Sequence, residues 1–173
     1  ESGVAFGHGG RRDHYTDVNL RELAAAIERL KAHYAPKRTV LVGHSGGAAS
    51  AAVLLGMAPG LADSAVLVAC PCDLGAWRAS RGGGAWSRSE NPNAWIGKVA
   101  PSTRVIALTG ERDDNTRPQL AEAYVKALTA QGVQARFAAL PYADHNSAFR
   151  APEVTSALRE LLTTPDAAPA AKP

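Results

Sequence analysis

The sequence predicts an α/β fold, in which helices cover both faces of a mostly parallel sheet. Strand-like and helix-like segments alternate along its 173 residues, which is the pattern of such sheets. This length is enough for one domain with one sizeable core. The strands are expected at 39–42, 64–69, 104–109 and 134–140.

Helix signals lie between these strands. Asn19 and Glu22 form a capping-box pattern that opens the first helix, and Pro36 closes it. Thr116 and Gln119 form a second capping box. The other helices are expected at about 48–57, from Pro118 to about 130, and at 152–162.

One domain is expected over residues 1–163, followed by an Ala/Pro-rich disordered tail over 164–173. Residues 73–99 carry all three tryptophans, including Trp77, and a run of three glycines. Weak patterning with so many aromatic residues predicts a small lid or specificity loop. The alternative is that the tryptophans simply pack on the scaffold.

The charge pattern excludes a nucleic-acid role. Nineteen basic and 16 acidic residues give a formal charge of +3, and both signs are spread along the chain. No apolar run approaches the ~20 residues of a membrane span, and no signal peptide is visible at Glu1.

The two cysteines, Cys70 and Cys72, flank Pro71. Partners two residues apart do not easily reach disulfide geometry, so we expect two thiols at the end of a strand. A bridge to another chain is the alternative. No His/Cys spacing completes a metal site.

The chain is organised around residues 39–56, where an apolar strand leads to Gly43-His44-Ser45-Gly46-Gly47 and then to an Ala-rich helix. This is a G-x-S-x-G pattern in its strand–turn–helix context. Such a tight turn lifts the hydroxyl of Ser45 clear of the sheet, above the positive end of the helix.

A serine nucleophile needs a base, and the base needs an orienting acid. Candidates follow two later strands, where functional groups of a parallel sheet gather. Asp113 and Asp114 follow the strand at 104–109, and His145 follows the strand at 134–140.

Three motifs in this order make the chain resemble serine hydrolases of the α/β-hydrolase superfamily, of the esterase, lipase and prolyl-oligopeptidase-like kind. They are G-H-S-G-G at 43–47, G-x-x-D at 110–113 and D-H-N at 144–146. The resemblance covers residues 3–163, which would form the catalytic domain.

The resemblance implies Ser45 as nucleophile, His145 as general base and then acid, and Asp113 as the orienting carboxylate, with Asp114 as the alternative acid. The amide of Gly46 would hold the oxyanion. His44, Cys70 and Trp77 are further candidates for substrate contact. No metal or other cofactor is expected.

The second oxyanion donor of this superfamily comes from an earlier loop. Residues 11–42 hold only one helix and one strand, so His8-Gly9-Gly10 is too close to the turn to be that loop. We therefore expect the sheet to lack its first N-terminal strands. We hypothesise that a separate N-terminal chain of the same precursor, after processing, completes the sheet.

The implied activity is hydrolysis of a carboxylic ester through an acyl-serine intermediate. The alternatives are a serine peptidase or amidase of the prolyl-oligopeptidase-like kind, and a catalytically silent hydrolase fold that only binds. A secreted or periplasmic location is expected if the chain derives from a processed precursor.

Overall fold

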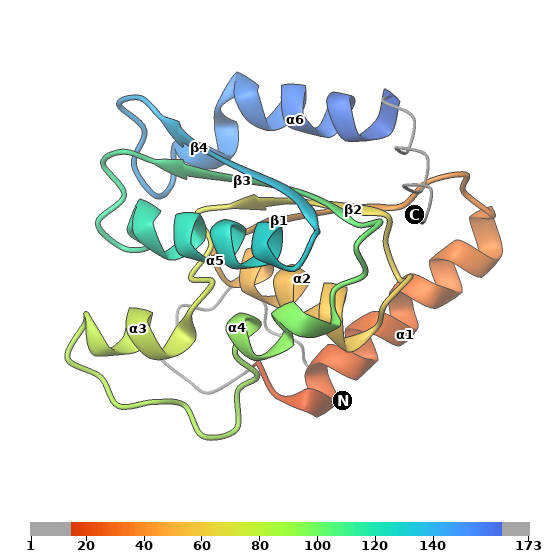
Figure 1. The fold of residues 1–173 in the computed structure, drawn as a ribbon, viewed down its shortest axis with the longest axis horizontal. Coiled ribbons are helices and arrows are strands. Elements are labelled where there is room, and N and C mark those ends of the chain that lie inside the picture. The colour runs from red at the N-terminus through yellow and green to blue at the C-terminus, as the bar shows by residue number, and fades with distance from the viewer. Residues whose placement is uncertain (1–14, 164–173) are drawn as a thin grey trace.

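The computed structural model describes residues 15–163. Its centre is a four-stranded sheet in the order β1-β2-β3-β4, with every neighbouring pair parallel. All four strands therefore end at the same edge (Figure 1). The strands are β1 (Val40–His44), β2 (Ser64–Val68), β3 (Arg104–Gly110) and β4 (Gln134–Leu140).

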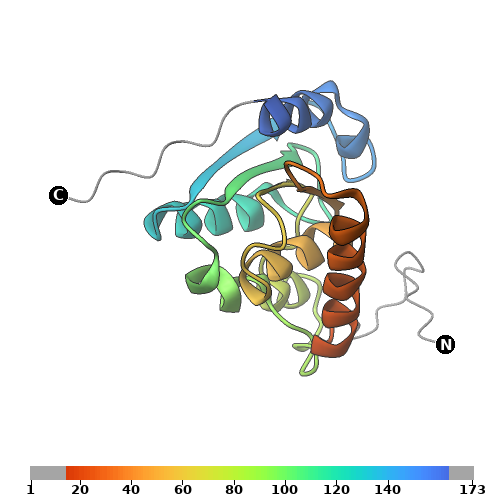
Figure 2. The same ribbon diagram turned by 90° about the vertical axis from the view of Figure 1, so that its right-hand side faces the viewer.

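Helices cover both faces of this sheet, as the sequence predicts. The helices α2 (Gly46–Met57) and α5 (Pro118–Ala130) pack on one face, and α6 (Pro152–Thr163) packs on the other (Figure 2). The first helix, α1 (Asp17–Tyr34), lies against α2 beside β1. A short 3₁₀ helix, η2 (Ala148–Arg150), precedes α6.

The core follows the two-residue period of the strands. Ala65 and Leu67 of β2 face the cluster under α2 and α5, whereas Val66 and Val68 face the cluster under α6. All five residues of β2 are buried, as expected for an inner strand covered on both sides.

Two helix starts differ from the predicted capping boxes. Thr16, not Asn19, is the N-cap of α1, and its hydroxyl accepts a hydrogen bond from the Asn19 amide. Arg117 precedes α5 without any capping side chain. The hydroxyl of Thr116 is instead committed to Asp113 and lies close to His145.

The outer edge of β1 has no strand partner among the described residues. An open apolar groove runs beside it, lined from α1, β1 and α2 by residues that include Ile27, Leu41 and Leu54. His8-Gly9-Gly10 and the predicted tail at 164–173 lie outside the described residues. The hypothesis of a separate N-terminal chain stays a prediction.

The 73–99 segment contains two short helices, α3 (Leu74–Ala79) and α4 (Pro92–Trp95), followed by the 3₁₀ helix η1 (Ile96–Lys98). Asp73 caps α3 and also accepts a hydrogen bond from the side chain of Asn91, the N-cap of α4, so the starts of the two helices are joined. Trp95 packs closely on Gly56 of α2, so this tryptophan belongs to the scaffold.

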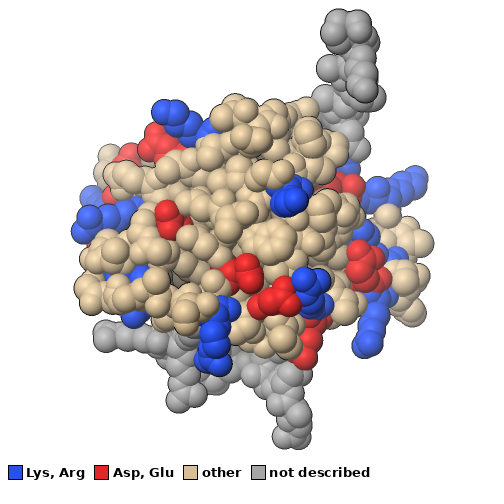
Figure 3. All heavy atoms as spheres, turned by 60° about the horizontal axis from the view of Figure 1, so that its bottom comes forward, with Lys and Arg blue, Asp and Glu red and all other residues tan. Residues whose placement is uncertain are grey.

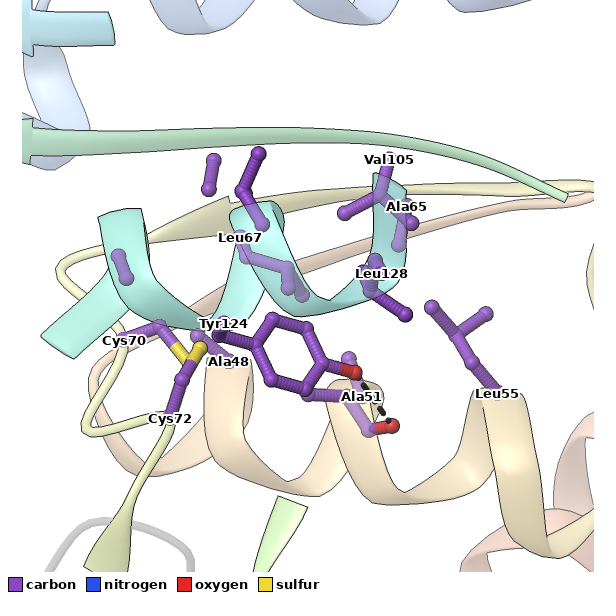
Figure 4. Packing of buried hydrophobic residues seen from close by; sticks show 14 of the residues in the cluster. Ala48, Ala51, Leu55, Ala65, Leu67, Cys70, Cys72, Val105, Tyr124 and Leu128 are labelled. Atoms are coloured by element: carbon purple, nitrogen blue, oxygen red, sulfur yellow. Dashed lines mark hydrogen bonds between the residues drawn. A yellow bond between two sulfur atoms is a disulfide. The ribbon is translucent and has the colours of Figure 1, made fainter. Parts of the chain in front are cut away.

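The prediction of two free thiols is wrong, because Cys70 and Cys72 form a disulfide. Their Cα atoms are 5.0 Å apart, within the range that a disulfide spans. Ala69 has a left-handed backbone (φ 49°), which turns the chain at the end of β2. Both sulfurs lie in the core beside Tyr124 and Ala48 (Figure 4).

We expect reduction of this disulfide to lower the free energy of unfolding by about 1.5 kcal/mol, a small effect because the closed loop is very short. Urea unfolding with and without reductant measures it. The C70A/C72A double variant is the control and should not respond to reductant. Two titratable thiols in the unreduced, denatured protein would contradict the assignment.

Candidate active site

The turn between β1 and α2 holds Ser45 in an unusual backbone conformation, with φ 53° and ψ −117°. A non-glycine residue with positive φ is held there only by its surroundings. Part of the hold is the hydrogen bond from the Ser45 amide to the Val68 carbonyl of β2, at 2.9 Å. Gly43 must lack a side chain, because a Cβ would collide with the Gly47 carbonyl.

The turn, the loop after β3 and the loop after β4 bring three predicted residues into contact. The Nε2 atom of His145 lies 2.9 Å from the Ser45 hydroxyl oxygen. Its Nδ1 atom lies 2.9 Å from Oδ2 of Asp113. If Ser45 donates its proton to Nε2, Nδ1 carries the ring proton and donates to Asp113.

Asp113 is almost fully buried, with 3 % of its surface exposed, and four hydrogen bonds surround its carboxylate. Oδ1 accepts from the amides of Asn115 and Thr116, and Oδ2 accepts from His145 and from the Thr116 hydroxyl. Burial alone would raise the pKa of this carboxyl, but the hydrogen bonds from His145 and Thr116 lower the pKa below its ordinary value.

Asp114, the alternative acid, is not part of this cluster. Its side chain is exposed, and it forms no hydrogen bond or ion pair with any described residue. Between the two carboxylates that the sequence leaves open, only Asp113 contacts His145.

Thr116 belongs to the site, whereas the sequence pattern predicts it as the cap of the helix that begins at Pro118. It is fully buried, its hydroxyl donates to Asp113 Oδ2 at 2.8 Å, and it lies 3.1 Å from His145 Nδ1. Thr116 follows Asp113 by three residues, the spacing at which an Asp side chain accepts hydrogen bonds from its own loop. This spacing is the sequence signal that indicates the contact.

His44 supports the loop that carries His145. Its Nε2 donates to the main-chain carbonyl of His145 at 2.8 Å, and the two imidazole rings lie 4.9 Å apart. The ring of Phe149 lies on His44 at 5.4 Å. The hydrogen bond from His44 orients the loop that carries His145. The predicted contact of His44 with substrate stays a prediction.

Gly46 is the first residue of α2, so its amide has no acceptor inside the helix. The amide and the positive end of the helix are therefore available to an anion beside Ser45. The Tyr15 hydroxyl lies directly against Gly46, at the place a Cβ would occupy. Burial raises the pKa of this phenol, which keeps it neutral.

Of the other predicted substrate contacts, Trp77 is bonded to the loop of Asp113, whereas Cys70 is buried. The indole of Trp77 donates to the Asn115 carbonyl at 2.9 Å, which ties the 73–99 segment to the loop of Asp113. Trp86 packs on Trp77 and on Tyr15. Cys70 is fully buried in its disulfide and has no surface to offer a ligand.

Three other properties of the described residues are their surface charge, the character of their helices and their potential metal ligands. Basic and acidic side chains are interspersed on the face shown in Figure 3. No helix within 15–163 has the length and apolar character needed to cross a bilayer. The same residues contain no group of three or more His, Cys, Asp or Glu side chains arranged to hold a metal.

Gly43→Ala is expected to destabilise the protein by about 3 kcal/mol, because the added Cβ meets backbone that cannot move aside. The matched control is Gly47→Ala, whose Cβ meets open space in a helix and should stabilise slightly, by about 0.5 kcal/mol. Urea unfolding measures both. Equal effects at the two positions would contradict the described turn.

The solved structures most similar to the chain include hydrolases of two kinds. An esterase from Pyrococcus furiosus aligns with a TM-score of 0.70 and 17% identity, over 84% of this chain and 62% of the esterase. An acylaminoacyl peptidase from Pyrococcus horikoshii aligns with a TM-score of 0.67 and 13% identity, over 87% of this chain and 29% of the peptidase.

The esterase domain of a Rhodothermus marinus protein aligns with a TM-score of 0.60 and 21% identity, over 86% of this chain and 68% of that domain. At these identities the likeness shows the fold, and the chain spans 62% of the Pyrococcus furiosus esterase. No curated protein matches the sequence. Residues 1–162 match the prolyl oligopeptidase family. The chain therefore has the α/β-hydrolase fold and belongs to the prolyl oligopeptidase family.

Proposed function

We propose that this chain carries the catalytic residues of a serine hydrolase that cleaves carboxylic esters through an acyl-serine intermediate. The observation that carries the proposal is the continuous contact from Ser45 through His145 to buried Asp113, with 2.9 Å at each link. A nucleophile, its base and an orienting acid in this geometry suit acyl transfer.

In the proposed reaction the Ser45 oxygen attacks the ester carbonyl while His145 Nε2 takes the hydroxyl proton. Asp113 stabilises the resulting imidazolium through Nδ1. His145 then protonates the departing alcohol, and the acyl group remains on Ser45. Water, activated by the same histidine, releases the acid and restores the serine.

The negative oxygen of the tetrahedral intermediate would accept a hydrogen bond from the Gly46 amide. This amide is held at the start of α2, so it needs no reorganisation during the reaction. One such donor is typically worth about 3 kcal/mol in the transition state. The proposed chemistry uses no metal or organic cofactor.

A peptidase or amidase is the second candidate, and the family match favours it. The 73–99 segment is short and forms only α3, α4 and η1, which suits an open site and a small ester. Esters also demand less protonation of the leaving group than amides. The contacts around Asp113 argue against a silent binding module, since such a module has no use for them.

Labelling with a fluorophosphonate, followed by intact mass and peptide mapping, tests the proposed nucleophile. We expect one label, on Ser45, in the wild type and none in Ser45→Ala. The intact masses also reveal whether a second chain accompanies this one. A folded wild type that takes no label would overturn the proposed function.

Comparison of p-nitrophenyl acetate with the matching p-nitroanilide separates the two candidate substrates. The proposal expects hydrolysis of the ester and none of the anilide, because only the anilide needs its poor amine leaving group to be protonated. Hydrolysis of the anilide would favour the peptidase.

The neighbouring carboxylates provide a matched pair of variants. Asp113→Asn should lower kcat by about 10³-fold, because an amide cannot hold His145 as the Nδ1–H tautomer. Asp114→Asn should change kcat less than twofold, since this side chain is exposed and does not contact His145. Ester hydrolysis by both folded variants is the measurement. The reverse ranking would make Asp114 the acid.

A further inference from the structure

The Thr116 hydroxyl shares one carboxylate oxygen with His145. Thr116 Oγ1, His145 Nδ1 and Asp113 Oδ2 form a triangle with sides of 2.8, 2.9 and 3.1 Å. The side chain of Thr116 is fully buried, and its own amide donates to Oδ1 of the same carboxylate at 2.7 Å. The hydroxyl is therefore held in one place.

The proposed reaction assigns the protons of this triangle. Nε2 of His145 must be free to accept the Ser45 proton, so Nδ1 carries the ring proton. The Thr116 hydroxyl then cannot donate to Nδ1 and donates to Asp113 Oδ2. Two protons, one from the imidazole and one from the hydroxyl, converge on a single oxygen.

We propose that Thr116 is a positioning residue that fixes the Asp113 carboxylate and weakens its attraction for protonated His145. The inference rests on the proposed function of His145 as the base. By donating to Oδ2, the hydroxyl offsets part of the negative charge that faces the protonated ring of His145.

Other titratable groups surround His145 but do not replace this effect. Asp113 faces it from the loop after β3, His44 faces it from the end of β1, and Asp144 precedes it in the loop after β4. The carboxylate of Asp144 is exposed and accepts hydrogen bonds from Asn146 and Ser147. The charged residues that flank Asp113 are exposed: Glu111, Arg112 and Asp114.

Thr116→Val removes the hydroxyl at nearly constant volume, and Thr116→Ser keeps it. The chain supplies a matched control in Thr109 of β3, whose buried hydroxyl has no hydrogen-bond partner among the described residues. Thr109→Val therefore removes a buried hydroxyl without touching the carboxylate. Thr116→Ala carries the same expectation as Thr116→Val and replaces it if the valine variant does not fold.

Two measurements follow the protonation of His145. One is the pH profile of kcat/KM for p-nitrophenyl acetate, and the other is the NMR titration of the His145 ring, which needs no substrate. In Thr116→Val we expect both midpoints to rise by about half a pH unit. The plateau of kcat/KM should fall about tenfold, as for one hydrogen bond to a charged group.

Thr116→Ser and Thr109→Val should keep the wild-type midpoint. An unchanged or lowered midpoint in Thr116→Val, or the same rise in Thr109→Val, would overturn the inference. The NMR titration separates failure of this inference from failure of the proposed function. A shifted ring midpoint without any ester hydrolysis would contradict only the proposed function. Ester hydrolysis without a shift of the His145 midpoint would contradict only the role of Thr116.

Discussion

The rest of the site depends on how tightly the chain turns between β1 and α2. Ser45 has a positive φ, and Gly43 lies so close to Gly47 that any side chain at Gly43 would collide with the Gly47 carbonyl. The turn places the serine oxygen at the carboxyl edge of the sheet, where the loops after β3 and β4 also end. Because the turn is bound to β2 through the Val68 carbonyl, the sheet itself fixes the position of Ser45.

Around Ser45, each residue of the cluster is positioned by a contact with a further residue. His145 is oriented by Asp113 on its ring and by His44 on its main chain. The loop of Asp113 is in turn tied to the 73–99 segment through Trp77, and that segment follows the disulfide at the end of β2. Segments that are distant in sequence therefore meet around one carboxylate, which is buried and accepts four hydrogen bonds.

The strands, the helices on both faces and the turn at Ser45 could be predicted because hydrophobic period and glycine spacing are local properties. The remainder depends on tertiary contacts. Asp113 and Asp114 are adjacent and chemically identical; the motif spacing favours Asp113, but its contact with His145 is visible only in the folded chain. The capping-box reading of Thr116 was wrong because a nearby carboxylate competed for its hydroxyl. The Cys70 disulfide was missed because the turn at Ala69 is not visible in sequence spacing.

The central claim is that Ser45 and His145 act as one unit, and the rates of ester hydrolysis by Ser45→Ala, His145→Ala and the double variant test it most directly. Groups that work only together show no further loss when the second is removed. The account predicts the same residual rate for all three folded variants. A double variant slower by the product of the two single losses, or a fully active His145→Ala, would contradict it.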